Sequence, residues 1–272
     1  MSETTLLAEV SGGSLRVRVA GPPEGTRMLF LHGGPGLSDS YLDELIAEFS
    51  DTDRVATYSQ RGVQPSEAAE PFDLPVQVAD VTAVLNALGW PEAIVVGHSW
   101  GAHLLLHLLA ARTSRLRAAV AIDALGAVGD GQSEAFGEEL LRRLSPEARA
   151  RSEQPDLPDD EQFAVIWPGY FPLGTPVPVL RPVAAYPETN AAVTEAMFDA
   201  LPLLAGRLNG VTTPTLFITG IGSPMPETAA AETAALLAGP VVINRVPGGH
   251  FPWLVSPGAV RAAVDEFLSA LP

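Results

Sequence analysis

Hydrophobic and polar positions form two patterns that alternate along most of the chain. Short apolar runs, many of them β-branched, predict buried strands at residues 27–31, 54–58, 94–97, 118–122, 215–219 and 241–246. Apolar residues at helical spacing predict helices at residues 39–49, 76–88, 102–111 and 257–271. Two earlier runs, at residues 6–10 and 14–19, predict a hairpin. Strands that alternate with helices predict an α/β fold, in which a mostly parallel central sheet is flanked by helices on both faces.

One long segment interrupts this alternation. Residues 131–206 are rich in acidic residues and proline, contain no clear strand, and have helical spacing at 134–143 and 191–204. The segment also carries many aromatic residues, which disordered segments lack. We therefore predict a core made of residues 1–130 and 207–272, with residues 131–206 inserted as a mainly helical cap over the strand ends.

The chain is acidic and has no cysteine. Its net charge of −16 argues against nucleic acid and against anionic membranes as partners. Without cysteine there is no disulfide, no thiolate nucleophile and no cysteine-ligated metal. No apolar run approaches the ~20 residues of a membrane span, and the first residues do not resemble a secretory signal, so we expect a cytoplasmic protein. The sequence leaves the oligomeric state open.

The pentapeptide from Gly97 to Gly101 carries the strongest chemical signal. It reads Gly-His-Ser-Trp-Gly, which matches the Gly-x-Ser-x-Gly pattern of a nucleophile elbow. A predicted strand precedes it and a predicted helix follows it, so Ser99 would lie on a sharp strand-to-helix turn. The helix N-terminus there favours a developing negative charge. The alternative is an ordinary glycine-bounded turn with a surface serine, which the flanking strand and helix make the weaker interpretation.

A serine nucleophile needs a base and an oxyanion hole. Of the five histidines, His250 lies in the loop between the last predicted strand and the last helix, where an α/β-hydrolase places its base. For the oxyanion hole we predict two backbone N–H donors. One belongs to Trp100, directly after the nucleophile, and the other to Gly34 in a glycine-rich loop that ends an early strand.

These motifs together resemble the α/β-hydrolase superfamily, and within it the proline iminopeptidase-like hydrolases of peptidase family S33. The resemblance covers most of the chain and rests on four segments: His32-Gly33-Gly34-Pro35-Gly36, Gln60-Arg61-Gly62 with Ser66, Gly97-His98-Ser99-Trp100-Gly101, and Gly249-His250-Phe251. Ser59 and Gln64 depart from the family pattern around the Gln-Arg-Gly segment, which puts the local hydrogen bonding of that loop in doubt. The resemblance implies the α/β-hydrolase fold and a Ser–His–acid triad.

The acid of this triad is missing from its usual place. Family members commonly carry it in a Gly-x-x-Asp segment after the penultimate strand, but here Ser223 stands at that position. We predict that Asp123, 24 residues after Ser99 and at the end of a fully apolar strand, is the acid instead. A charge there needs a partner, and His250 would supply one. Two alternatives stay open: Asp123 as a capping residue, and Glu227 as the acid, although a helix N-terminus explains Glu227 equally well.

The expected reaction is a two-step acyl transfer that needs no metal and no organic cofactor. The first hypothesis is an aminopeptidase that removes an N-terminal proline or another small amino acid from a peptide or amide. The second is an esterase, lactonase or thioesterase-like hydrolase of a small apolar metabolite. The third, suggested by Ser223, is a non-catalytic binding protein on a hydrolase scaffold.

The cap is expected to contact a small-molecule or short-peptide substrate. The resemblance implies that cap carboxylates bind a substrate amine, and Glu188 and Glu195 are candidates. The aromatic residues Trp167, Tyr170 and Phe171 would line an apolar acyl or prolyl pocket. They would equally form the core of the cap.

Overall fold

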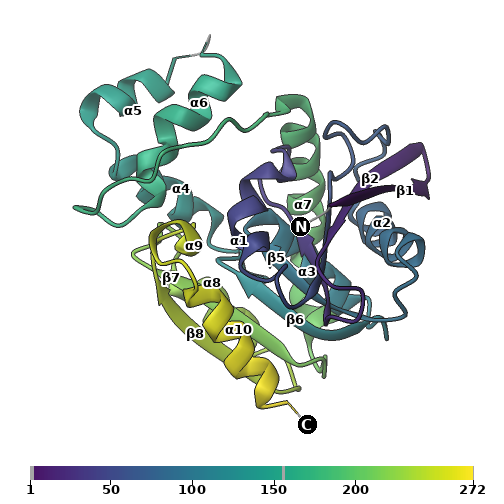
Figure 1. The fold of residues 1–272 in the computed structure, drawn as a ribbon. Helices are drawn as coiled ribbons and strands as arrows, with labels where there is room; N and C mark the ends of the chain where they lie inside the picture. The colour runs from purple at the N-terminus through teal and green to yellow at the C-terminus, as the bar shows by residue number, and fades with distance from the viewer. Residues whose placement is uncertain (1–2, 155–156, 272) are drawn as a thin grey trace.

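The computed structural model describes residues 3–154 and 157–271, and its centre is a twisted sheet (Figure 1). The described strands form one sheet of eight in the order β1-β2-β4-β3-β5-β6-β7-β8. Their bounds are Thr4–Val10 (β1), Gly13–Ala20 (β2), Arg27–Leu31 (β3), Arg54–Tyr58 (β4), Ala93–His98 (β5), Leu116–Ile122 (β6), Thr215–Ile221 (β7) and Val241–Pro247 (β8). β2 pairs antiparallel with β1 and β4, and every pairing from β4 to β8 is parallel. The mostly parallel sheet predicted from the apolar runs is confirmed.

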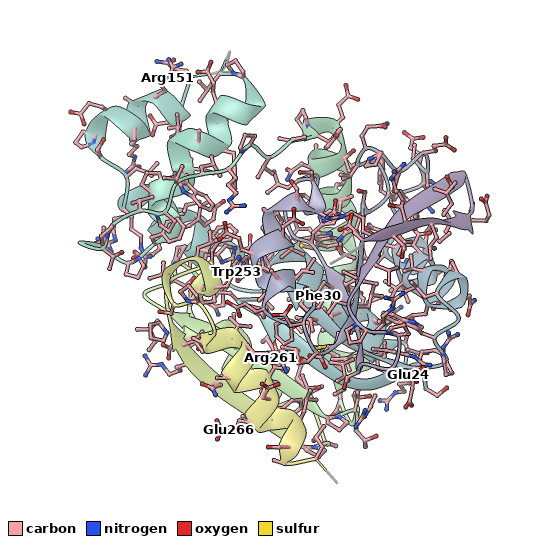
Figure 2. All side chains as sticks on the ribbon, viewed as in Figure 1. Glu24, Phe30, Arg151, Trp253, Arg261 and Glu266 are labelled. Atoms are coloured by element: carbon pink, nitrogen blue, oxygen red, sulfur yellow. The ribbon has the colours of Figure 1, made fainter. Side chains whose placement is uncertain are left out.

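Helices cover both faces of the sheet, because successive strand residues point to opposite sides. Leu29 and Val95 join one buried cluster, while their neighbours Phe30 and Val96 join the other. The first cluster lies under α2 (Leu74–Ala87), α3 (Trp100–Ala110), α7 (Pro187–Leu208) and α8 (Glu227–Ala234). The second lies under α1 (Asp43–Ala47), α9 (Pro252–Val255) and α10 (Ala259–Ser269). In Figure 2, Phe30 and Trp253 lie inside this packing, while Glu24, Arg151 and Glu266 lie at the periphery.

The segment between β6 and β7 is mainly helical. It contains α4 (Ser133–Arg142), α5 (Pro146–Ser152), α6 (Asp159–Ile166), the 3-10 helix η2 (Trp167–Tyr170) and α7. In Figure 1, α5 and α6 stand out from the sheet, while α7 lies against the body of the molecule. Val193, Met197 and Leu204 of α7 are buried in the same cluster as the leucines of α3. None of the helices in the described ranges is long and apolar enough to cross a membrane.

The loop in which Ser59 departs from the family pattern is well anchored. The Ser59 hydroxyl donates to Asp39 at 3.1 Å, and the Ser59 carbonyl accepts from Ser66 at 2.5 Å. The guanidinium of Arg61 forms a buried bidentate ion pair with Asp80, with N–O distances of 2.8 and 2.9 Å. Removing one partner of such a pair leaves a buried charge uncompensated. The loop therefore holds its shape with a serine at position 59.

Two buried histidines of α3 make stability depend on pH. Burial lowers the pKa of His103 to about 4 and that of His107 to about 3, from 6.5 in the unfolded chain. The unfolded chain therefore takes up both protons as the pH falls below 6.5, while the native protein does so only near pH 4 and pH 3. We expect the free energy of unfolding to fall over this range by up to about 1.4 kcal/mol per pH unit for each histidine.

Urea unfolding of the wild type and of His107→Gln between pH 4.5 and 6 measures this contribution. In the variant, the unfolding free energy is expected to depend less steeply on pH, by up to about 1.4 kcal/mol per pH unit, because glutamine takes up no proton in either state. Equal slopes for the two proteins would show that His107 is not held neutral by burial.

Candidate active site

Ser99 lies on a tight turn between β5 and α3. Its backbone angles are φ 53° and ψ −120°, a left-handed region that L residues rarely adopt. A side chain at Gly101 would meet the Leu31 carbonyl oxygen at 2.2 Å, and one at Gly97 would meet the Gly101 carbonyl oxygen at 2.4 Å, so both positions require glycine. The flanking residues His98 and Trp100 are buried, but Ser99 is partly exposed. The turn therefore presents this hydroxyl to solvent from an otherwise buried segment.

Asp123 and His250 form a buried pair. His250 Nδ1 donates to Asp123 Oδ2 at 2.5 Å, and each residue is only 2% exposed. Asp123 directly follows β6 and has a φ of 47°. Its Oδ1 accepts from the Gly220 N–H at 3.0 Å, and its own N–H donates to the Ile218 carbonyl at 2.8 Å. These bonds aim the carboxylate at the imidazole and leave His250 Nε2 as the nitrogen that can exchange a proton with a substrate or a nucleophile.

Among the described residues, the Ser99 hydroxyl has no hydrogen-bond partner. Hydrogen bonds between a nucleophile and its base are often long in the absence of substrate and tighten when substrate binds. The elbow after β5, the carboxylate after β6 and the histidine after β8 all follow the carboxyl ends of parallel strands, so they lie at one edge of the sheet.

Ser223 contacts the carboxylate from a second side. Its hydroxyl donates to Asp123 Oδ2 at 2.5 Å and accepts from the Met225 N–H at 3.0 Å. The serine that stands where relatives carry an acid thus contributes a hydrogen bond to Asp123. Glu227, the rival acid, begins α8 and is half exposed, with its carboxylate 2.7 Å from Arg245. The structure therefore brings Asp123 to His250, and not Glu227.

The imidazole of His250 is enclosed by aromatic rings from the cap. Tyr170 of η2 stacks on it with ring centroids 5.2 Å apart, and Phe136 of α4 lies 5.3 Å away. The Tyr170 carbonyl also accepts the His250 N–H at 2.9 Å. Burial raises the pKa of the Tyr170 hydroxyl, so that it stays protonated. Residues of the cap thus help to orient His250.

The two predicted oxyanion donors lie on segments that are tied together. The Trp100 indole N–H donates to the side-chain oxygen of Gln60 at 2.8 Å, and the Gln60 amide donates to the His32 carbonyl at 2.7 Å. His32 Nδ1 donates to the Gly33 carbonyl at 2.9 Å, which orients the peptide that carries the Gly34 N–H. Within the described ranges, the backbone N–H groups of Gly34 and Trp100 have no acceptor. Both amides are therefore available to an oxyanion.

Comparison with known proteins identifies the fold. A family model described as alpha/beta hydrolase fold matches residues 26–157. The protein has the α/β-hydrolase fold. The solved structure of a proline iminopeptidase from Mycobacterium smegmatis superposes with a TM-score of 0.72 at 23% identity and covers 98% of each chain. The resemblance to α/β hydrolases that the motifs indicate is thereby confirmed.

Two curated relatives align with this chain over nearly its full length. The 2-(acetamidomethylene)succinate hydrolase of Mesorhizobium japonicum is 26% identical and covers 99% of this chain and 97% of its own. Epoxide hydrolase A of Mycobacterium tuberculosis is also 26% identical and covers 98% of each chain. Both relatives are named as hydrolases, and the two names describe different substrates.

A cavity of about 340 Å³ adjoins this candidate site. Gly34 of the oxyanion loop and Tyr170 beside His250 form part of its wall. Its other lining residues are Pro35, Gly36, Leu37, Gln162, Phe163, Ile166, Ala185, Tyr186, Pro187 and Asn190. None of these lining residues is acidic or basic. The cavity is therefore suited to an uncharged group.

The structure places the five expected pocket residues differently from one another. Tyr170 lines the cavity. Trp167 and Phe171 are buried instead against the ring of Phe251, with centroid distances of 4.8 and 6.0 Å, so they belong to the packing between cap and core. Glu188 and Glu195 are exposed on α7 and are not among the lining residues. The sequence did not indicate Tyr186, directly before α7, or Asn190, in the first turn of α7, and both line the cavity.

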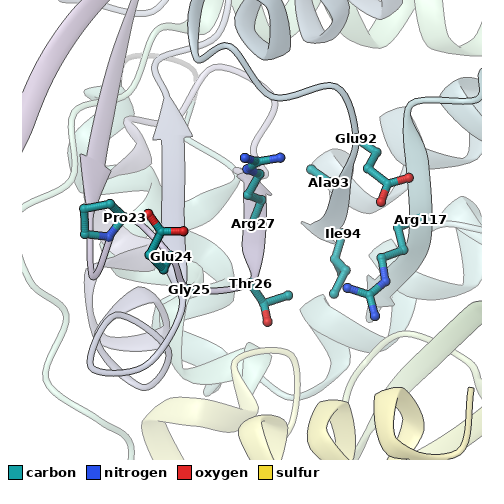
Figure 3. A pocket seen from close by; sticks show the side chains of 9 residues that line it. All are labelled: Pro23, Glu24, Gly25, Thr26, Arg27, Glu92, Ala93, Ile94 and Arg117. Atoms are coloured by element: carbon teal, nitrogen blue, oxygen red, sulfur yellow. The ribbon is translucent and has the colours of Figure 1, made fainter.

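A second cavity, of about 290 Å³, lies at the opposite ends of the strands (Figure 3). It is lined by charged residues, Glu24, Arg27, Glu92 and Arg117, at the start of β3, β5 and β6. Ser99, Asp123 and His250 follow the carboxyl ends of the strands, at the other edge of the sheet. This cavity is therefore separate from the group that Ser99, Asp123 and His250 form.

Proposed function

We propose that this protein is a serine hydrolase that cleaves a small ester or amide through an acyl-enzyme. The observation that carries the proposal is the buried 2.5 Å hydrogen bond between Asp123 and His250, at the edge of the sheet where the elbow presents Ser99. Epoxide hydrolases and dehalogenases of this fold need a carboxylate nucleophile to form their ester intermediate, so a serine in the elbow favours acyl transfer. A non-catalytic binding protein would have no need of this arrangement.

The proposed reaction has two steps. His250 Nε2 takes the proton of Ser99 as the serine oxygen attacks the carbonyl carbon, and the N–H groups of Gly34 and Trp100 stabilise the oxyanion. His250 then gives the proton to the leaving group, which departs as an alcohol or amine. Water, deprotonated by His250, releases the acid and restores Ser99. Asp123 holds the tautomer with the proton on Nδ1 and stabilises the imidazolium that forms.

The neutral cavity favours a substrate without a charge near the scissile bond. An aminopeptidase has to bind an ammonium group, and burying a cation without a partner is costly. The likeness of the His32-Gly36 and Gln60-Arg61-Gly62 segments to proline iminopeptidases favours such a peptidase as the second candidate. The chemical difference between the two candidates is the charge on the acyl side of the substrate.

Two matched anilides separate the candidates. Proline 4-nitroanilide and N-acetylproline 4-nitroanilide share ring and leaving group, but only the first has a free amine. We expect kcat/KM to be at least about tenfold higher for the acetylated compound, because no lining residue can pair with an ammonium. A preference for the free amine would instead identify an aminopeptidase. Comparing N-acetylproline 4-nitroanilide with the 4-nitrophenyl ester of N-acetylproline shows whether esters are preferred to amides.

A further inference from the structure

Two side chains outside the proposed triad connect the oxyanion loop to the catalytic histidine. The Gly33 N–H donates to the hydroxyl oxygen of Tyr41. The Tyr41 hydroxyl is 3.0 Å from His98 Nδ1, and His98 Nε2 is 2.8 Å from the His250 carbonyl oxygen. Tyr41 belongs to the 3-10 helix η1 (Asp39–Leu42), and His98 is the residue before the nucleophile. One chain of hydrogen bonds thus spans three separate loops of the site.

The direction of every bond in this chain follows from one acceptor. A carbonyl oxygen only accepts, so His98 Nε2 carries a proton and donates to His250. A neutral imidazole has one N–H, so His98 Nδ1 is an acceptor and receives the hydroxyl proton of Tyr41. The Tyr41 oxygen keeps its lone pairs for the Gly33 N–H.

The surroundings keep these protons in place. Burial and the neighbouring His250 lower the pKa of His98 well below its usual value, so its ring stays neutral. Burial also raises the pKa of Tyr41, so its hydroxyl stays protonated, although Asp39 and Tyr170 contribute to that shift as well. The Tyr41 ring is held independently of its hydroxyl, because it stacks on Trp253 with centroids 6.4 Å apart.

We propose that Tyr41 and His98 are positioning residues, which hold the Gly33–Gly34 oxyanion loop and the backbone of His250 in fixed register. The inference rests on the proposed function, because the groups that Tyr41 and His98 position are the oxyanion hole and the base of that reaction. Gly33 directly precedes the predicted oxyanion donor, and the carbonyl that His98 binds belongs to the base itself. Catalysis needs these groups placed to within a fraction of an ångström, so loosening the chain lowers the rate of chemistry more than it weakens substrate binding.

Tyr41→Phe tests the proposal, because it removes one oxygen and keeps the ring. We expect kcat for the preferred substrate to fall about tenfold with KM nearly unchanged. A boronic acid that mimics the tetrahedral intermediate should lose affinity by the same factor. Tyr58→Phe is the matched control, since Tyr58 is a buried tyrosine of β4 in the opposite core cluster, and it should leave both values unchanged.

Nitrogen NMR of His98 tests the same chain of hydrogen bonds without an activity measurement. The wild type should show the tautomer protonated on Nε2, and Tyr41→Phe should shift the Nδ1 resonance toward that of an imidazole nitrogen without a hydrogen bond. A His98 protonated on Nδ1, or a Tyr41→Phe variant with wild-type kcat and boronate affinity, would overturn the inference alone. A wild-type protein that hydrolyses none of the esters or anilides would overturn the proposed function, and this inference with it.

Discussion

Replacing Ser99 with alanine is expected to lower kcat for ester and anilide substrates by about 10⁴-fold to 10⁶-fold, as loss of the triad nucleophile does in serine hydrolases. Without the hydroxyl no acyl-enzyme forms, and only the oxyanion hole and substrate binding remain to assist water. The measurement is hydrolysis of a 4-nitrophenyl ester followed by absorbance. Urea unfolding should show that the fold survives, since the change removes one partly exposed oxygen.

Ser40→Ala is the matched control for this variant. Ser40 is an exposed serine of η1, where its hydroxyl contacts only that of Ser38 at 2.8 Å. It should keep wild-type kcat and KM. If Ser99→Ala retained wild-type kcat, the nucleophile would have to be another group, and the acyl-enzyme mechanism would be wrong.

The second large effect is expected from Asp123→Asn, which should lower kcat by about 10⁴-fold because an amide favours the wrong tautomer of the base. The asparagine side chain has nearly the same shape as that of Asp123. Apart from the bond to His250, the change therefore affects mainly the hydrogen bonds that the Asp123 carboxylate accepts from Gly220 and Ser223. Glu227→Gln is the control. It removes the rival acid, whose carboxylate pairs with Arg245 at the surface, and should leave kcat unchanged.

Moving the carboxylate tests the geometry behind this expectation. Ser223 Oγ and His250 Nδ1 both lie 2.5 Å from the same oxygen of Asp123. The carboxylate introduced by Ser223→Asp should therefore reach His250 Nδ1 and accept its hydrogen bond. We expect kcat of the double variant Asp123→Asn/Ser223→Asp to be at least about tenfold higher than that of Asp123→Asn alone. Full activity in Asp123→Asn alone, or its loss in Glu227→Gln, would contradict the assignment of the acid.

Much of the core was predictable because its signals are local. The apolar runs that end at Leu31, Ile122 and Val246 correspond to β3, β6 and β8 within two residues at each end. The hydrogen bond between Asp123 and His250 was also within reach, because a charge that ends a fully apolar strand must find a partner. The catalytic role of both residues stays a prediction until the variants are measured.

Boundaries were less predictable where a single residue decides them. The apolar spacing over residues 257–271 predicts the last helix, which is α10 at Ala259–Ser269, but the short helix α9 at Pro252–Val255 was not predicted. Gly258 between them adopts a φ of 81°, which stops a right-handed helix. The short helices α5 and α6 carry no apolar period that would have distinguished them from a loop.

The cap pocket was the least predictable part of the site. Trp167 and Phe171 have the composition of a substrate pocket, but aromatic residues serve a pocket and a core equally well, and here both are buried against Phe251. The contacts of His98 also could not be predicted. They depend on Tyr41 and His250, which lie far away in sequence and meet only when the sheet is assembled.

The measurement that tests the central proposal most directly is labelling with a fluorophosphonate followed by peptide mapping. The reagent reacts with a serine only when a base and an oxyanion hole activate it. The expected result is one adduct, on the peptide that contains Ser99, which forms rapidly in the wild type and far more slowly in Asp123→Asn. An unlabelled wild-type protein, or an adduct on any other serine, would contradict the assignment of Ser99 as the nucleophile.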